Sequence, residues 1–264
     1  IVTNWGWRSL FWLTGGIGVA FAGVWFLFYR EPHDSRANAA ELAFIAAGGG
    51  LSTAKAPPFS WAMLGRLIRK RQVLGASIGQ FCGNSTLVFF LTWFPSYLAD
   101  ERGMDWLKSG WAAALPYLAA SVGVLVGGQL SDWLIRRTGS ATLGRKLPII
   151  VGLLLTSTMI GANFTNSNDL VIAIMSLAFF GQGMVNLGWT LITDVAPREA
   201  VGVTGGLFSL CANLAGIVTP LVIGVIVGAT GSFYGALAYI AALGLIGAAA
   251  YVLIVGPVER VSLD

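Results

Sequence analysis

The chain has 264 residues, of which 56% are hydrophobic and 11% charged, with a formal net charge of +4. Soluble globular domains carry about 25% charged residues, so this composition excludes an ordinary soluble protein. Two cysteines and one histidine offer neither a disulfide framework nor metal-ligand spacing, so we expect no metal and no cofactor.

Seven charge-free stretches of membrane-spanning length follow one another along the chain. A helix needs about 20 mostly apolar residues to cross roughly 30 Å of hydrocarbon. The stretches are 10–28, 73–98, 109–131, 147–164, 170–193, 200–228 and 233–256. Their apolar residues are continuous rather than alternating, which favours helices over an outer-membrane barrel. We therefore expect an all-α transmembrane protein with one span, a long polar interval and then six closely spaced spans.

The interval after the first span is the only long connection in this plan. Its helical spacing around Glu41 and Phe44 predicts a short surface helix, followed by flexible glycines at 48–50 and an extended proline segment at 57–58. The basic run 66–71 is amphipathic and should lie at the cytoplasmic membrane interface. We predict four segments: a helix at 1–30, a cytoplasmic loop at 31–72, a six-helix bundle at 73–257 and a cytoplasmic tail at 258–264.

Positive charges fall unequally on the two sides of this seven-span order. Of the 16 Lys and Arg residues, only Arg8, Arg102 and Lys108 fall on the side of residue 1. Short loops rich in Lys and Arg stay in the cytoplasm, so residue 1 is expected outside and the C-terminus inside. The excess of positive charge therefore indicates membrane topology and contact with anionic membrane lipid. We expect no nucleic-acid partner.

Glycine and proline mark particular places within the predicted spans. Glycines recur on single helix faces as Gly123/Gly127, Gly202/Gly205/Gly206 and Gly244/Gly247, a pattern that permits close helix approach. Prolines lie within or near three spans, at Pro95, Pro116 and Pro220, where they should kink or end a helix.

The middle of every predicted span lacks Asp, Glu, Lys, Arg and His. Without a buried base or an activated nucleophile, a membrane-embedded enzyme is hard to build, so we expect no enzymatic activity. What remains at membrane depth is a set of neutral polar side chains. The candidates for substrate binding are Gln80 and Asn84 in the second span, Asn186 and Trp189 in the fifth, and Ser209 and Asn213 in the sixth.

Helical spacing places the two members of each candidate pair on one helix face. Amides and hydroxyls around an aqueous cavity would suit a polyhydroxylated solute, and the Trp189 ring could cover its apolar side. The alternative is that these groups hydrogen-bond across helices or back to their own backbone carbonyls.

A second pattern lies between the third and fourth spans. Its residues are Gly128, Asp132, Arg136, Arg137, Arg145 and Lys146. Asp132 lies near the C-terminal end of its helix, where the helix dipole disfavours a negative charge. It therefore requires a cationic neighbour or the N-terminus of another helix. A loop that latches to another helix in one conformation would supply this; the alternative is a basic loop that only sets topology.

The pattern from Gly127 to Lys146 resembles the loop signature of the major facilitator superfamily. Further similarity lies in Gly6-Trp7-Arg8, in 89–98, in 189–197 and in 216–220, and it points to the anion:cation symporter branch, close to bacterial glucarate, galactarate and galactonate transporters. The resemblance implies twelve helices in two halves in a bacterial inner membrane. This chain would supply helix six, the central loop and the C-terminal half.

The resemblance also implies uptake of a sugar-acid anion driven by a cation, with a proton as the expected cation. It implies that Gln80 or Asn84, together with Asn186, Trp189 and the Ser209/Asn213 face, contacts the sugar hydroxyls. The chain departs from the family pattern at Ser209, where relatives are expected to carry Asn. The coupling carboxylates and a substrate-binding Arg are expected in the missing N-terminal half, so this chain alone should not transport.

Other functions fit the same residues. A transporter-derived membrane sensor of sugar acids could keep the same cavity, and a carrier of hexuronates or other organic anions could use the same side chains. A seven-helix receptor is suggested by the number of spans but is opposed by the unequal loop lengths.

Overall fold

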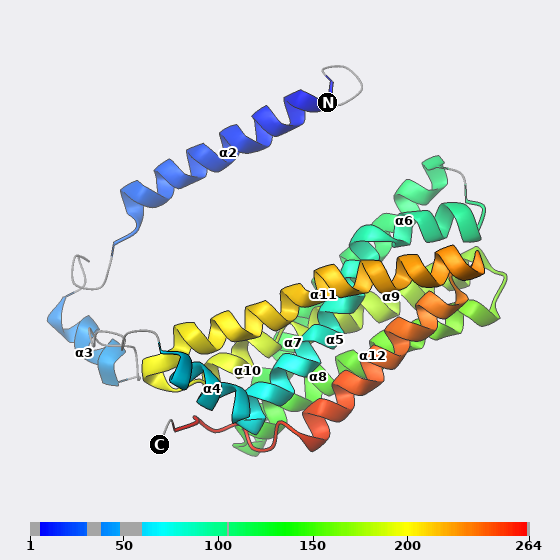
Figure 1. The fold of residues 1–264 in the computed structure, drawn as a ribbon. Coiled ribbons are helices and arrows are strands. Elements are labelled where there is room, and N and C mark those ends of the chain that lie inside the picture. The colour runs from blue at the N-terminus through cyan, green and yellow to red at the C-terminus, as the bar shows by residue number, and fades with distance from the viewer. Residues whose placement is uncertain (1–5, 31–37, 48–59, 105, 263–264) are drawn as a thin grey trace. The chain divides into compact units, whose positions relative to one another are not determined.

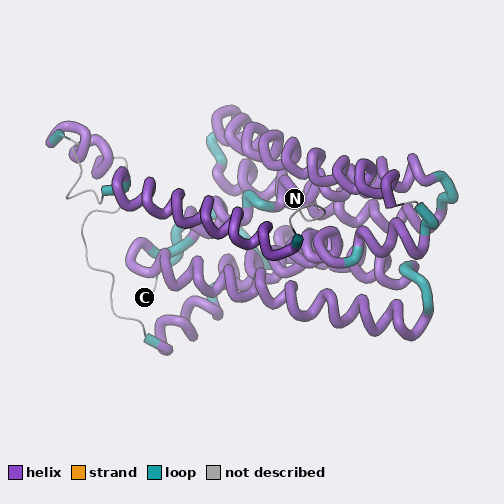
Figure 2. The backbone as a smooth tube through the Cα atoms, turned by 90° about the horizontal axis from the view of Figure 1, so that it is seen from above, coloured by secondary structure: helices purple, strands orange, loops and turns teal. Residues whose placement is uncertain are grey.

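The computed structural model describes residues 6–30, 38–47, 60–104 and 106–262. Every regular element within these ranges is a helix (Figure 2). The chain divides into two units, residues 1–55 and residues 56–264, which are described separately.

The first unit contains α2 (Trp7–Phe28) and α3 (Ala39–Ala47). None of the 22 residues of α2 is buried in the unit, as expected of a helix surrounded by lipid. The predicted surface helix is confirmed as α3. It begins with a reciprocal cap, in which the Glu41 amide donates to Asn38 Oδ1 and the Asn38 amide donates to Glu41 Oε2, both at 2.9 Å. The predicted segments at 48–50 and 57–58 lie outside the described residues.

The second unit is a bundle of long helices (Figure 1). Its α-helices are α4 (Trp61–Arg69), α5 (Arg71–Thr92), α6 (Phe94–Ser96), α7 (Trp106–Thr138), α8 (Ala141–Ser157), α9 (Asn168–Val185), α10 (Gly188–Val195), α11 (Val201–Thr230) and α12 (Tyr234–Leu253). A short π-helix (Tyr97–Glu101) and two 3₁₀ helices (Thr158–Phe164 and Arg198–Ala200) join them. Together with α2 they supply seven candidate membrane spans, so the predicted all-α transmembrane fold is confirmed.

The bundle is built around α5, α8 and α9. Helix α9 packs against α7 and α8, whereas α12 joins α5 to α8 and α11 covers α5. The largest buried cluster is aromatic, with Phe90 stacked on Phe179 at 4.0 Å between ring centroids. The short helix α4 is amphipathic and buries Met63 and Leu67 against Ala200 at the start of α11.

Glycines allow several of these helices to touch through their backbones. A Cβ atom at Gly123 on α7 would meet the Phe180 carbonyl oxygen, and a Cβ at Gly244 on α12 would lie 2.8 Å from the Leu153 carbonyl oxygen. Close approach is therefore confirmed for Gly123/Gly127 and Gly244/Gly247. It is not found at Gly202, Gly205 and Gly206, where a Cβ would meet no atom within 4 Å because this side of α11 is open.

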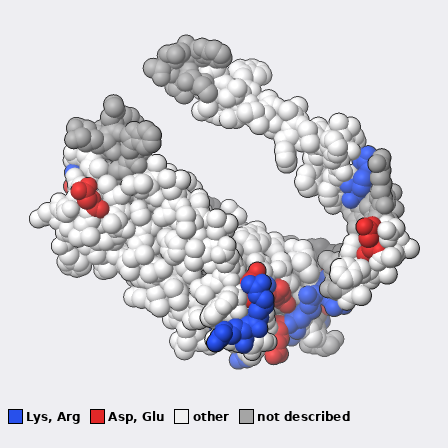
Figure 3. Space-filling view, turned by 180° about the vertical axis from the view of Figure 1, so that it is seen from behind, with Lys and Arg blue, Asp and Glu red and all other residues white. Residues whose placement is uncertain are grey.

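The two ends of the bundle differ in charge. At one end of the bundle, α7 leads into α8, and α10 and α12 terminate. Lys and Arg side chains gather there, and we call it the basic end (Figure 3). At the opposite end, Glu101 accepts hydrogen bonds from Ser232 Oγ and the Phe233 amide, both at 3.1 Å, and so caps the start of α12. Arg102 donates to the Thr165 carbonyl oxygen at 3.0 Å.

Candidate functional site

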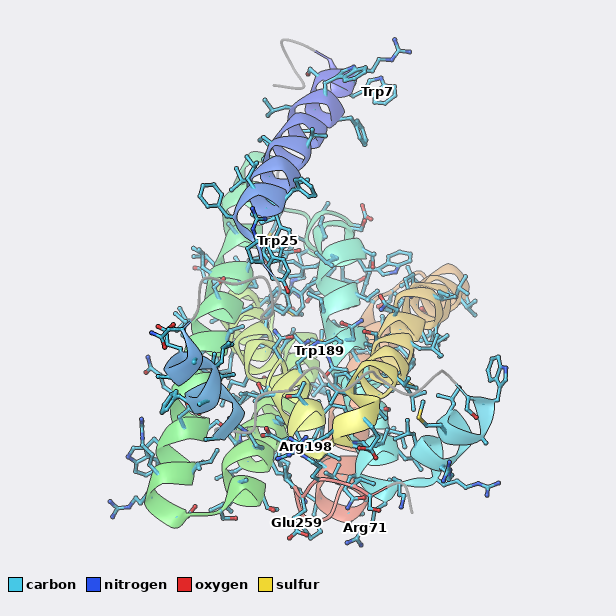
Figure 4. All side chains as sticks on the ribbon, turned by 90° about the vertical axis from the view of Figure 1, so that its left-hand side faces the viewer. Trp7, Trp25, Arg71, Trp189, Arg198 and Glu259 are labelled. Atoms are coloured by element: carbon cyan, nitrogen blue, oxygen red, sulfur yellow. The ribbon has the colours of Figure 1, made fainter. Side chains whose placement is uncertain are left out.

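Five of the six candidate substrate-binding residues lie on α5, α10 and α11, three helices that contact one another, and the sixth, Asn186, lies just before α10. Trp189 lies partway along the bundle rather than at either end (Figure 4). The residue is 42% exposed, and its ring packs edge-on against Phe208 of α11, with 5.0 Å between ring centroids. Ser209 and Asn213 follow Phe208 on the same helix. We refer to the surface formed by Asn84, Trp189, Ser209 and Asn213 as the polar face.

The fifth span is broken where it reaches this face. Helix α9 ends at Val185 and α10 begins at Gly188, although the sequence predicted one continuous helix over 170–193. The backbone between them makes i→i−3 hydrogen bonds, from the Leu187 amide to the Met184 carbonyl at 3.2 Å and from the Trp189 amide to the Asn186 carbonyl at 3.2 Å. A 3₁₀ stretch inside a long helix is typical of a functional hinge. Asn186 lies in this break and is exposed.

Gln80 lies behind the break. Its side chain is only 3% exposed, so in this structure it lies beneath the polar face. A Cβ atom at Gly188 would lie 2.6 Å from Gln80 Oε1, 3.2 Å from Phe208 Cζ and 3.2 Å from the Tyr251 hydroxyl. The absence of a side chain at position 188 therefore lets α5, α11 and α12 converge on the break. Among the described residues, Gln80 Oε1 and the Tyr251 hydroxyl have no hydrogen-bond partner.

Replacing Gly188 with alanine should therefore damage the hinge. The added methyl group would displace the Gln80 amide or the Phe208 ring, at a cost of about 1–3 kcal/mol for overpacking. We expect a lower melting temperature of the purified chain in detergent. Gly216→Ala on α11 is the matched control because a Cβ there meets nothing within 4 Å. An unchanged melting temperature for Gly188→Ala would show that this site is loosely packed.

The amide donors on the polar face already have backbone partners. Asn84 Nδ2 donates across helices to the Ala212 carbonyl oxygen at 2.6 Å. Asn213 Nδ2 donates within its own helix to the Ser209 carbonyl oxygen at 2.8 Å. Both bonds are of the kind that the alternative interpretation predicted. Asn213 is nevertheless exposed, and Asn84 and Ser209 are partly exposed, so all three remain accessible from the polar face.

Arg145 ties three helices together at the basic end. From α8 its Nε donates to Asp194 Oδ2 of α10 at 2.9 Å, and its Nη1 donates to Ser131 Oγ of α7 at 2.9 Å. The contact with Asp132 Oδ1 is longer, at 3.4 Å, and that side chain is 63% exposed. The position of Asp132 predicted a neighbouring cation or the N-terminus of another helix. Arg145 is that cation, but it lies closer to Asp194 than to Asp132. We call Arg145, Asp194 and Ser131 the arginine clamp.

The other residues of the predicted loop pattern lie around the clamp. Arg136 and Arg137 are exposed at the end of α7, where the Arg137 guanidinium lies over the Trp133 ring. Lys146 points to the turn that follows α12, with Nζ 3.1 Å from the Gly256 carbonyl oxygen. Gly128 is not tightly packed, because a Cβ there would meet nothing within 4 Å.

Three residues of this region were not singled out as site residues from the sequence. Phe208 and Tyr251 are fully buried aromatic side chains in apolar spans, where nothing in the sequence distinguishes them from core residues. Asp194 did carry a signal, since it is the one charge at the edge of a predicted span, and the structure pairs it with Arg145. Among the described residues, His, Cys, Asp and Glu form no group of three suited to a metal ion.

Comparison with known proteins agrees with this architecture. Residues 1–142 match the Major Facilitator Superfamily. The chain is 43% identical to a probable galactarate/D-glucarate transporter of Escherichia coli (strain K12) and 44% identical to one of Bacillus subtilis, in each case over 98% of the chain and 59% of the relative. It is 43% identical to a D-galactonate transporter of Escherichia coli O6:H1, over 97% of the chain and 61% of the relative.

The chain thus spans about three fifths of the length of these relatives. The prediction that it is not an enzyme is confirmed, because its close relatives are transporters of one family. Seven apolar helices and this family match together describe a multi-pass membrane protein. The chain belongs to the Major Facilitator Superfamily.

Proposed function

We propose that this chain is part of a secondary active transporter for a sugar-acid anion, a hexonate or hexarate such as galactonate or glucarate. A coupling cation, most simply a proton, would drive uptake by alternating access across a bacterial inner membrane. The observation that best supports this proposal is the polar face, where neutral hydrogen-bonding groups and an aromatic ring lie beside a broken span. Relatives named as galactarate/D-glucarate and D-galactonate transporters support the choice of substrate.

The chemistry of the polar face suits the polyol part of such a substrate. The Asn84, Asn213 and Ser209 side chains supply donors and acceptors for hydroxyl groups. The exposed part of the Trp189 ring supplies an apolar plane for the C–H side of the carbon chain. Asn186 and the groups behind the hinge, including Gln80, would engage as α10 moves relative to α9.

Binding of the substrate carboxylate and coupling to a cation both require charged groups that this face does not supply. The described residues on the polar face are all neutral, whereas a sugar-acid carboxylate needs a cationic partner and proton coupling needs a titrating group. We propose that the substrate-binding Arg and the coupling carboxylates belong to the partner half of the transporter. The missing half would pack against the polar face, with residue 1 on the periplasmic side and the C-terminus in the cytoplasm.

A chimaeric transporter tests this function. The part of the Escherichia coli galactarate/D-glucarate transporter that this chain does not cover is joined to the chain, and uptake of labelled D-glucarate, galactarate and D-galactonate is measured in cells that lack their own carriers. We expect accumulation above the equilibrium level that collapses with a protonophore. Binding of these acids without uptake, accompanied by ligand-dependent signalling, would favour a sensor, and uptake of hexuronates alone would overturn the substrate assignment.

Trp189 should control affinity in this chimaera. In Trp189→Ala the ring that covers the sugar is lost, and we expect the KM to rise by about tenfold, the equivalent of about 1.4 kcal/mol. Trp189→Phe keeps an aromatic plane and should retain most of the affinity. Trp133→Ala, which removes an exposed ring from the basic end, is the control. Equal KM values for Trp189→Ala and Trp133→Ala would remove Trp189 from the binding site.

A further inference from the structure

A groove between α8 and α12 at the basic end has a polar edge and an apolar wall. Its volume is about 320 Å³. The polar edge consists of Ser140, Thr142 and Lys146, at the N-cap and in the first turns of α8. None of these residues belongs to the polar face, so the groove is distinct from the proposed transport site.

The polar groups at this edge can still donate hydrogen bonds to a ligand. Ser140 Oγ accepts from the Leu143 amide at 3.2 Å, and Thr142 Oγ1 accepts from the Val258 amide at 2.9 Å. Each hydroxyl therefore keeps its own O–H to donate. The Lys146 ammonium donates to one carbonyl oxygen, that of Gly256, and has two further N–H groups. Such an edge fits a ligand with several acceptor oxygens.

The charge at this edge is positive and not neutralised within the described chain. Lys146 forms no ion pair there, and the Arg71 guanidinium lies against the same Gly256 turn, where a Cβ would come within 2.8 Å of Arg71 Cζ. Glu259 of the tail is exposed and pairs with neither cation in the described residues. Arg71 and Glu259 both lie at this end of the bundle (Figure 4). The ligand of this edge should be an anion.

The remaining wall is apolar and runs along the membrane-spanning part of α8. Leu143, Leu147 and Ile150 are spaced by four and three residues, so they share one helix face. Val252 of α12 is 56% exposed and closes the other side. From Thr142 to Ile150 the helix rises about 12 Å, close to the roughly 15 Å depth of one hydrocarbon leaflet. An acyl chain would therefore lie along this wall while its headgroup reaches the polar edge.

We propose that this groove is a binding site for an anionic phospholipid, with the phosphate held by Lys146, Ser140 and Thr142 and one acyl chain lying along Leu147, Ile150 and Val252. The bound lipid would bridge α8, α12 and the tail that Thr142 and Lys146 hold in place. The site does not depend on which solute is transported.

Native mass spectrometry of the full chain in detergent tests the site. The chain is titrated with dioleoyl phosphatidylglycerol, with dioleoyl phosphatidylcholine and with inorganic phosphate. We expect one phosphatidylglycerol to be retained at least fivefold more tightly than phosphatidylcholine. Lys146→Gln keeps a donor for the Gly256 carbonyl but removes the charge, and it should weaken phosphatidylglycerol binding about fivefold. Arg260→Gln removes one exposed charge from the same end and should have little effect.

A second variant separates a lipid from a free phosphate. Val252→Trp fills the apolar wall from an exposed position and leaves the polar edge intact, so it should lower phosphatidylglycerol binding and leave phosphate binding unchanged. Size-exclusion profiles confirm that each variant is folded. Equal retention of the two phospholipids, equal effects of Lys146→Gln and Arg260→Gln, or phosphatidylglycerol binding that is insensitive to Val252→Trp would each overturn the proposal.

Discussion

Replacing Gly183 with alanine is expected to prevent the six-span bundle from assembling. A Cβ atom at this position would meet the Ala120 carbonyl oxygen and lie 2.8 Å from the Val124 amide nitrogen. Both are backbone atoms of α7, so no change of rotamer can relieve the contact and the two helices must separate. Overpacking usually costs about 1–3 kcal/mol, and a backbone clash along the α7–α9 contact should exceed that range. Gly123→Ala, on the facing helix, should have a similar effect.

The matched control lies on the open side of α11. Gly205→Ala adds the same methyl group where nothing lies within 4 Å, and alanine is a better helix former than glycine by about 1 kcal/mol. We expect Gly183→Ala to yield little monodisperse protein by fluorescence-detected size exclusion, and Gly205→Ala to match or exceed the unsubstituted chain. Similar profiles for the two variants would mean that α7 and α9 are not in backbone contact.

The spans could be predicted from the sequence because each depends on the number of consecutive apolar residues that a bilayer requires. The short helix α3 was predictable from the helical spacing around Glu41 and Phe44, and the structure adds a local cap between Asn38 and Glu41. Glycine faces were predicted with mixed success. The pattern around Gly123 and that around Gly202 are alike in sequence, but only the first faces another helix in the structure.

The candidate site could be predicted only in part. Sequence identified which polar side chains lie at membrane depth, but it could not show that Gln80 is buried while Asn213 is exposed. That difference depends on which helices pack together. The break at 186–187 was also missed, because Asn186 and Leu187 are compatible with a helix and the hinge arises where Gly188 lets three other helices converge. Tertiary contacts of this kind leave no local signature.

The arginine clamp explains why an acidic residue, Asp194, is tolerated at the C-terminus of α10. Asp132 and Asp194 both lie near the C-terminal ends of their helices, where the dipole raises the free energy of a negative charge. Arg145 offsets this cost for Asp194 with a charge-assisted bond, while its other branch reaches Ser131. Because the guanidinium fork holds α7, α8 and α10 at once, we propose that the clamp stabilises one of the two conformations of the transport cycle.

Arg145→Lys is therefore expected to reduce uptake by the chimaeric transporter at least tenfold. Lysine keeps the positive charge that sets topology, but its single ammonium group does not reproduce the two-branched contact with Asp194 and Ser131. Asp194→Asn removes the acidic partner of the same ion pair. Uptake by the double variant should therefore be little lower than uptake by either single variant. Because Asp194 is 40% exposed, the coupling energy should be only about 1 kcal/mol in stability, measured by a double-mutant cycle.

The same comparison decides between a latch and a loop that only sets topology. A topological role predicts normal uptake for Arg145→Lys and a defect only for variants that remove the charge. A latch predicts that Arg145→Lys and Arg145→Gln fail alike, while Arg69→Gln, which removes an exposed charge from α4, transports normally. Cysteine-accessibility labelling at Asn213 adds an independent readout, because a change in the populations of the two conformations should alter the labelling rate in Arg145→Lys without loss of folded protein.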